Sequence, residues 1–452
     1  MNRSSPFSSS PSYAARPASG TTLRKTTCAP ALRKLMFAAG TAAVVAACAP
    51  TPAPPPPAPS PEAVRDSIRR ADSLARAEVE RARLDSIRRA EEMAREAAER
   101  ARLDSIARVR AAQLRVCGGG DVMLGSNLDT TWATRASQRF GRRVAAFPDP
   151  DVLLAPLRPL VEDADVILFN VEGAIGEGPA PPKCRPGSTQ CYAFRQPVAA
   201  ADALARFAGE AAMVGNLANN HSRDAGEAGF VQTRRHLERA GVHVTGGDTL
   251  PTIVTARNGE AVAILGFHTA ETAPDARDLD AVRRHVSRAA AEHRRVVVTM
   301  HIGAEGARAQ RTGDSTEMFL GTIDRGNPVA FARAATESGA DLVIGHGPHV
   351  LRAMEWHGEA LVIYSLGNLL TYGPFTLSEP NNRGAVVCAT LDGEGWVLEA
   401  ALRSTVQVPP GIVRPDPGAH AAALIDSLTA LDFPETGARV RADGAIVRIP
   451  VP

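Results

Sequence analysis

The stretch G-N-L-A-N-N-H-S-R-D-A-G, from Gly215 to Gly226, contains the feature that decides the fold. It follows the apolar run A-A-M-V and precedes a segment with helical spacing, so it lies where a buried strand is expected to end. Taken alone, N-N-H predicts only a turn whose Asn side chains bond loop amides. The motif becomes significant because other apolar runs of the chain also end in polar residues.

From Leu114 onward, short apolar runs alternate with helix-like segments. The runs are L-R-V-C-G, D-V-I-L-F-N, A-M-V-G-N, A-V-A-I-L-G-F, R-V-V-V-T-M-H, D-L-V-I-G-H and L-V-I-Y-S-L. Such runs indicate strands covered on both faces, and the alternation with helices is typical of parallel strands joined by crossovers. A later pair around D-G-E-G predicts a hairpin. The fold class is therefore α/β.

Polar residues end most of these runs. They are Asp121 after Gly118–Gly120, Glu172 after Asn170, Asn220, His221 and Asp224, His301 with Glu305, His346 with His349, and Ser365 with Asn368. Ligands of open α/β sheets bind outside the carboxyl ends of the strands, so these segments are predicted to converge on one site. Four of the eleven His lie at such ends. The other seven, such as His285 and His293, are predicted to lie on the surface.

Asp, Glu, Asn and several His in one place predict a centre for two metal ions. Carboxylates can bridge two cations, while imidazoles and an amide oxygen complete the ligand shells. The mixed oxygen and nitrogen ligands suit Mn²⁺, Fe or Zn²⁺. A nearby unligated His could protonate a leaving group. Nucleotide cradling by G-G-G-D-V-M-L-G is excluded, because the run lacks the Lys-Ser/Thr of a P-loop.

Across about residues 115–375, an ordered set of motifs resembles the CapA-type poly-γ-glutamate capsule synthesis family. The motifs are Gly120-Asp121-Val122-Met123-Leu124, Asn170-Val171-Glu172-Gly173, Phe194-Arg195-x-Pro197, Ala218-Asn219-Asn220-His221, His301-x-Gly303-x-Glu305, Gly345-His346-Gly347-Pro348-His349-Val350 and Tyr364-Ser365-Leu366-Gly367-Asn368. The resemblance implies a variant of the calcineurin-like metallophosphoesterase fold, a four-layer α/β sandwich with a two-metal centre, over residues 114–405.

The resemblance also implies residue roles. The metal ligands would be Asp121, Glu172, Asn220, His301, His346 and His349, with His221 as the catalytic His oriented by Asp224. Arg195, Glu305 and Asn368 would bind the substrate, and Arg195 would suit an anionic group. Two positions depart from the family pattern. Met123 stands where phosphoesterases carry a His, and Gly347 stands where many relatives carry one.

The pattern of residues 1–48 indicates a targeting segment. Arg33 and Lys34 precede an apolar run that ends at Cys48 and is shorter than the ~20 residues of a membrane span. The ending V-A-A-C resembles a bacterial lipoprotein box, which implies cleavage before Cys48 and lipidation of its thiol. The alternatives are an ordinary signal peptide with an incidental Cys, or a start codon assigned too early. We expect the mature protein in the cell envelope, outside the cytoplasm and attached to the membrane through the lipid.

A Pro-rich linker at 49–61 precedes a charged segment at 62–113 that contains no Gly or Pro. Related motifs that begin D-S-I recur at Asp66, Asp85 and Asp104. This segment predicts a helix of roughly 80 Å, serving as a single stalk or as a weak coiled coil for self-association. Residues 406–452 form a Pro-punctuated C-terminal extension.

Four of the six Cys lie beyond the targeting segment. Cys184 and Cys191 bracket a Pro/Gly turn and are predicted to form a small disulfide loop, whereas a two-Cys metal site would lack a second pair. Cys117 and Cys388 lie in strand-like runs and are predicted to be buried thiols.

The formal net charge of +2 gives no case for nucleic acid as a partner. Two functions are the main candidates. One is a metal-dependent envelope hydrolase that acts on a phosphoester or a related polymer bond. The other is a non-hydrolytic assembly or anchoring factor for an anionic surface polymer such as poly-γ-glutamate. A structural lipoprotein with a decayed enzyme domain is the third option.

Overall fold

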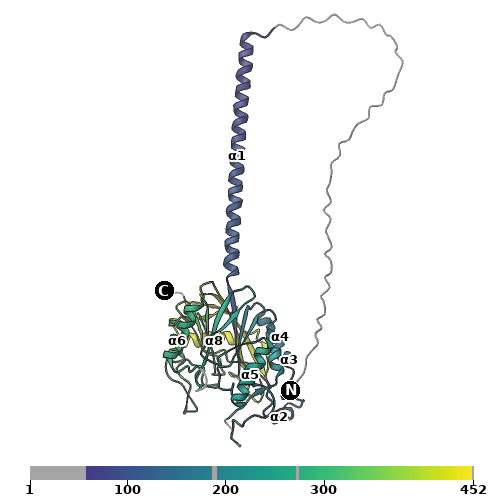
Figure 1. The fold of residues 1–452 in the computed structure, drawn as a ribbon, viewed down its shortest axis with the longest axis vertical. Helices are drawn as coiled ribbons and strands as arrows, with labels where there is room; N and C mark the ends of the chain where they lie inside the picture. The colour runs from purple at the N-terminus through teal and green to yellow at the C-terminus, as the bar shows by residue number, and fades with distance from the viewer. Residues whose placement is uncertain (1–57, 186–190, 271–273, 450–452) are drawn as a thin grey trace, which may run out of the picture. The chain divides into compact units, whose positions relative to one another are not determined.

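The computed structural model describes residues 58–185, 191–270 and 274–449. The lipidation predicted at Cys48 lies outside the described residues. The chain divides into two units, which meet between Ile87 and Arg88 inside helix α1 (Pro61–Ala111). Figure 1 shows the ribbon with its labelled helices.

The charged segment forms α1, a helix of 51 residues with no buried residue. Ion pairs one turn apart, such as Arg69 with Asp66 at 2.7 Å, line its surface. Its large apolar residues, including Ile68 and Leu74, are exposed. A helix that is polar on all sides is typical of a solvated segment, and 51 residues extend ~75 Å. Within the described part of the chain, no helix combines the length and apolar character needed to cross a membrane.

The larger sheet, called the first sheet, has ten strands in the order β19-β20-β17-β16-β1-β2-β5-β6, with β15 beside β1 and β18 beside β17. Strand β1 is parallel to β2 and β15 and antiparallel to β16. The strands are β1 (Leu114–Leu124), β2 (Val166–Val171), β5 (Ala212–Asn216), β6 (His243–Thr245), β15 (Asn368–Tyr372), β16 (Arg383–Leu391), β17 (Val397–Val408), β18 (Ile412–Pro415), β19 (Arg439–Val440) and β20 (Ala445–Val447). Residues beyond 405 thus contribute strands to the first sheet.

The second sheet has six strands in the order β13-β14-β12-β9-β8-β7. Its inner strands β8, β9, β12 and β14 run parallel, and antiparallel β7 and β13 form the edges. The strands are β7 (Thr252–Thr255), β8 (Ala261–His268), β9 (Val296–His301), β12 (Leu342–His346), β13 (Met354–His357) and β14 (Ala360–Ile363). The expected α/β class is confirmed.

Helices cover the outer face of each sheet. Against the first sheet pack α2 (Thr131–Phe140), α3 (Pro150–Leu154), the 3₁₀ turn η1 (Ala155–Leu160), α4 (Ala199–Ala208) and α5 (Gly226–Ala240). Against the second pack α6 (Leu279–Glu292) and α7 (Pro328–Glu337), while α8 (His420–Asp432) contacts strands of both sheets. Two short pairs, β3 (Ala174–Ile175) with β4 (Arg195–Gln196) and β10 (Met318–Phe319) with β11 (Ile323–Asp324), complete the fold.

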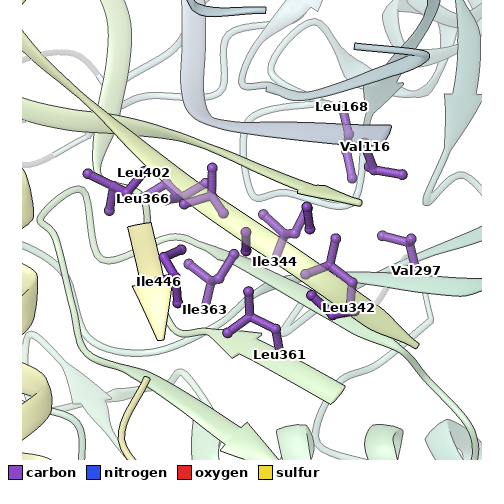
Figure 2. Close-up of a cluster of buried hydrophobic side chains, with 14 of the residues drawn as sticks. Val116, Leu168, Val297, Leu342, Ile344, Leu361, Ile363, Leu366, Leu402 and Ile446 are labelled. Atoms are coloured by element: carbon purple, nitrogen blue, oxygen red, sulfur yellow. The ribbon is translucent and has the colours of Figure 1, made fainter. Parts of the chain in front are cut away.

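The two sheets face each other across one apolar core. Val116 and Leu168 come from the first sheet, while Val297, Leu342 and Ile344 come from the second (Figure 2). Burial of each such side chain contributes about 1.5–3 kcal/mol. The alternation of residues along a strand places Ile344 in this core and Val343 in the core under the helices. The result is four layers, with helices outside and two sheets inside.

The glycines that end the first apolar run permit a close backbone contact. A Cβ atom on Gly120 would lie 2.0 Å from the carbonyl oxygen of Gly367, which is closer than any side chain tolerates. The adjacent Asp121 N–H donates to that same carbonyl at 3.0 Å. The Gly run therefore holds β1 against the loop before β15 and fixes where Asp121 lies.

The prediction that Cys117 and Cys388 are buried thiols is wrong, because the structure joins them in a disulfide. The two residues lie opposite each other on β1 and β16, which antiparallel pairing brings together from distant parts of the sequence. The structure also joins Cys184 to Cys191. Disulfides are typical of proteins outside the cytoplasm.

The buried carboxylate of Asp341 makes the stability of this fold depend on pH. Burial raises the pKa of Asp341 to about 7, from a usual 3.8, although its carboxylate accepts a hydrogen bond from Val296 N–H. A raised folded-state pKa adds stability that is present below about pH 4 and is lost as pH rises to about 7. At ~1.4 kcal/mol per pKa unit, the loss is about 4 kcal/mol.

Asp341→Asn keeps a hydrogen-bond acceptor but cannot ionise. We expect its free energy of unfolding to exceed that of the wild type increasingly between pH 5 and pH 8, measured by urea titration at each pH. Exposed Asp202→Asn on α4 is the matched control. A constant difference across this pH range would contradict the prediction.

Candidate metal centre

The carboxyl ends of strands from both sheets meet around one buried acid, Asp121. On the second sheet, His301 and His346 are register neighbours at the ends of β9 and β12. On the first sheet, Asp121 in β1 is the register neighbour of Asn170 in β2. The side chains of these four residues come together because parallel strands place their carboxyl ends at one edge of a sheet.

Asp121 is fully buried and contacts residues from both sheets. Its Oδ1 accepts a hydrogen bond from Asn170 Nδ2 at 2.8 Å, and its Oδ2 accepts one from His349 Nδ1 at 2.9 Å. His346 Nδ1 lies 3.7 Å from Oδ1. Burial by itself would raise the pKa of Asp121, but the His349 hydrogen bond and the two imidazoles lower it below its usual value.

Three carboxylates surround one imidazole. His349 Nδ1 lies 3.7 Å from Glu172 Oε2, and its Nε2 lies 3.7 Å from Glu305 Oε2. Burial alone would lower the pKa of His349, but Glu172, Asp121 and Glu305 raise it to about 10. Burial and the Asp121 charge raise the pKa of Glu172 well above its usual value. The site therefore holds three acids close together, and a cation would stabilise the ionised form of Glu172.

The backbone of His349 supports this placement. Its φ of 57° lies in the left-handed region, which costs a residue other than glycine roughly 1–2 kcal/mol. Two residues earlier in the chain, Gly347 has a φ of 108°, which a residue with an L side chain rarely adopts. G-H-G-P-H is thus a turn, as its composition allows, and the turn brings His349 to Asp121.

His346 gives the strongest sign of a metal-binding role. Its side chain is 0% exposed, yet neither ring nitrogen has a hydrogen-bond partner among the described residues. Burial lowers its pKa to about 4, so the ring is neutral and offers a lone pair. Buried imidazole nitrogens are normally paired, and coordination of a metal would satisfy one of these.

The amide of Asn220 fits a cation in the same place. One end of the amide lies 3.0 Å from His301 Nε2 and 3.3 Å from Glu172 Oε1, and the other end lies 3.2 Å from Arg325 Nη2. Without a cation, the NH₂ group would face inward toward these acceptors. With a cation, the amide oxygen would join the imidazole and the carboxylate as a ligand. Asp121, Glu172 and His349 also each offer a ligand atom within 4.8 Å of the others.

His221 and Asp224 form a pair beside this cluster. His221 Nδ1 lies 2.7 Å from Asp224 Oδ2, which also accepts a hydrogen bond from Phe194 N–H at 2.6 Å. Lys183 forms an ion pair with the other carboxylate oxygen. Burial lowers the pKa of His221, and the Asp224 charge opposes the shift. Asp224 thereby fixes the orientation of the ring and leaves Nε2 for a ligand.

A cavity of about 280 Å³ opens onto these residues. Glu172, His221, Glu305, His349 and Asn368 line it, so the structure brings Glu305 and Asn368 to the site. Arg195 is elsewhere. Its side chain is buried, Nε donates to Asn127 Oδ1 at 2.7 Å, and the residue does not line the cavity.

Two residues that the structure places at the site had no role in the sequence-based prediction. Asn170 donates to Asp121 and accepts hydrogen bonds from Asn216 and Asn219, so it connects β1, the end of β5 and the loop that follows β5. Arg325 pairs with Glu305 and is buried. The position of Asn170 at the end of an apolar run was a usable signal, whereas nothing in the sequence around Arg325 indicates its place.

The prediction of a surface position is wrong for His268. It ends β8 in register with His301 and is 2% exposed. Its Nδ1 accepts a hydrogen bond from Ala270 N–H, and burial lowers its pKa to about 4. The apolar run A-V-A-I-L-G-F, extended by one residue, would have placed it at a strand end.

Residues 115–372 match the family model described as Bacterial capsule synthesis protein PGA_cap, which covers more than half of the chain. The chain therefore belongs to this family of bacterial capsule synthesis proteins. Its strand-end motifs lie within the matched region.

Two named proteins are similar to part of the chain. "Capsule biosynthesis protein CapA" of Bacillus anthracis is 28% identical over 174 residues, which cover 34% of this chain and 39% of the relative. "PGA biosynthesis protein CapA" of Bacillus subtilis is 29% identical over 173 residues, covering 34% and 41%. The matched region thus spans about two fifths of the length of each relative.

Among solved structures, a putative 5′-nucleotidase from Staphylococcus aureus shares 13% identity at a TM-score of 0.34, covering 67% of this chain and 53% of that one. The NAD nucleotidase of Haemophilus influenzae shares 12% at 0.31, covering 70% and 55%. At these TM-scores the likeness assigns no activity to this chain.

We expect the wild type, purified without chelator and reloaded with Mn²⁺, to hold one or two ions per chain by elemental analysis. Asp121→Asn removes the charge at the centre of the cluster and should weaken binding at least about tenfold in calorimetric titration. His285→Ala, which alters a half-buried His on α6, is the control and should bind as the wild type does. Equal affinity in all three proteins would place the metal elsewhere.

Proposed function

We propose that this chain is a cell-envelope protein with a metallophosphoesterase-type site, which hydrolyses a phosphoester or a related bond in the synthesis or processing of an anionic surface polymer such as poly-γ-glutamate. The observation that supports the proposal is the convergence of buried carboxylates and unpaired imidazole nitrogens from both sheets. The names of the two relatives support a role in capsule synthesis.

The residues fit a divalent cation, and the expected metals remain Mn²⁺, Fe or Zn²⁺. The side chains that would hold one or two ions are Asp121, Glu172, Asn220, His301, His346 and His349. When bound, such an ion supplies positive charge that stabilises a phosphoryl group as negative charge develops on it. Asn170 would orient Asp121 from behind through its 2.8 Å hydrogen bond.

His221 is the proposed proton carrier. Asp224 engages Nδ1 of this cavity-lining residue, which leaves Nε2 as the atom that would hold the proton for a leaving oxygen. Asp224 stabilises the charged form of the ring, and Phe194 N–H and Lys183 keep Asp224 in place. This arrangement orients the ring without placing His221 among the proposed metal ligands.

A non-hydrolytic role as a polymer-binding or anchoring lipoprotein is the second candidate, and Met123 favours it. Met123 lines the cavity at the position where phosphoesterases carry a His, so one metal site has a ligand fewer. In both candidates, a lipid on Cys48 would attach the protein to the membrane. The proposed spacer is the Pro-rich linker with α1, through which chains could self-associate.

Hydrolysis of 4-nitrophenyl phosphate by Mn²⁺-loaded protein tests the first candidate. We expect His221→Ala to lower kcat by about 10²–10⁴-fold, because it removes the proton carrier, while metal content stays unchanged. The matched control is His236→Ala, which alters a half-buried His on α5. Bound metal without turnover, together with affinity for polyglutamate, would reject hydrolysis and favour the second candidate.

A further inference from the structure

We propose that the cavity beside the metal centre contains a subsite for a planar aromatic or heteroaromatic ring, carried by the ligand next to its anionic group. The inference rests on the proposed function and names the class of substrate for the same site, a phosphomonoester of a ring-bearing alcohol.

Aromatic side chains are concentrated in this cavity. Four of its fifteen lining residues are aromatic, whereas aromatic residues make up 4% of the chain. They are Tyr192, Phe194, Phe319 and Phe375. Tyr192 and Phe194 come from one segment, and Phe319 and Phe375 from two others far away in the sequence, so the fold brings three segments together.

Three of the four rings form a continuous wall that leads to the proposed proton carrier. Phe194 is stacked with Tyr192 at a centroid distance of 6.1 Å and an interplanar angle of 21°. It also contacts Phe375 at 5.1 Å and His221 at 4.7 Å. Phe194 is 5% exposed, while Tyr192 is 52% exposed and Phe375 is half-buried. The rings of Tyr192 and Phe375 therefore retain surface for a ligand.

The charges of the cavity lining distinguish a polyanionic ligand from a ligand with an uncharged ring. The fifteen lining residues include the carboxylates of Glu172 and Glu305 but no Lys or Arg. Arg325 is not in the lining; it is paired with Glu305 and lies 5.4 Å from the Phe319 ring centroid. A cation at the centre would attract one anionic group, but further carboxylates along a polyanion would meet no Lys or Arg among the lining residues. An uncharged flat ring suits this wall.

The size of the cavity agrees with one ring. Its volume of about 280 Å³ lies just below the range of about 300–1,000 Å³ that is usual for small-molecule sites. One ring joined to one anionic group would fill much of that space. A longer polymer segment would have to continue beyond it.

Binding of three probes to Mn²⁺-loaded protein tests the subsite by calorimetry: inorganic phosphate, benzylphosphonate and cyclohexylmethylphosphonate. The two phosphonates resist hydrolysis and share an anionic group, and only the first carries a flat aromatic ring. We expect benzylphosphonate to bind about tenfold more tightly than cyclohexylmethylphosphonate, through stacking on the wall.

Phe375→Leu keeps an apolar side chain but removes the ring. It should reduce the preference for benzylphosphonate to about twofold or less and leave phosphate binding unchanged. Trp396→Ala alters an exposed aromatic residue that does not line the cavity, and it should keep the full preference.

The outcomes separate the two proposals. If phosphate binds and the wild type binds both phosphonates equally, the subsite is rejected while the proposed function stands. If phosphate does not bind to the metal-loaded protein, the proposed function fails and the subsite fails with it. The phosphonate comparison uses the unaltered protein, so it decides the question even if Phe375→Leu does not fold.

Discussion

The site depends on the close packing of three carboxyl groups around the single imidazole of His349. Asp121, Glu172 and Glu305 approach His349 from different segments, and its imidazole must then carry a proton with a pKa of about 10. Such an arrangement is costly unless the acids are paired or bind a cation. The unpaired nitrogens of His346 point to the same need. A metal ion would relieve both strains at once.

The two sheets make this concentration of charge possible. The core between them, with Val116 and Ile344 on opposite sides, holds the carboxyl ends of β1, β9 and β12 at one edge. Gly120 lets β1 approach the Gly367 backbone, and that contact sets the position of Asp121. The same construction leaves room for the aromatic wall around Phe194. The architecture thus supplies a fixed charged end and a flat apolar side to one cavity.

The sequence allowed the α/β class and most strand-end candidates to be predicted, because hydrophobic periodicity and a polar stop are local signals. Asp121, Glu172, His301 and His346 are of this kind. Pairing between distant strands is not local, so Cys117 and Cys388 gave no sign that β1 and β16 would bring them together. Arg325 belongs to an irregular loop, where periodicity carries no information. The role of Arg195 in substrate binding was predicted from a motif alone. In the structure its side chain bonds Asn127 and does not line the cavity.

The most direct test of the central claim is anomalous diffraction at the manganese edge, from crystals of the protein grown with Mn²⁺. The account predicts one or two peaks among Asp121, Glu172, His346 and His349, within coordination distance of about 2.0–2.3 Å of their ligand atoms. A crystal that reproduces the arrangement of these side chains but shows no peak there would contradict the account.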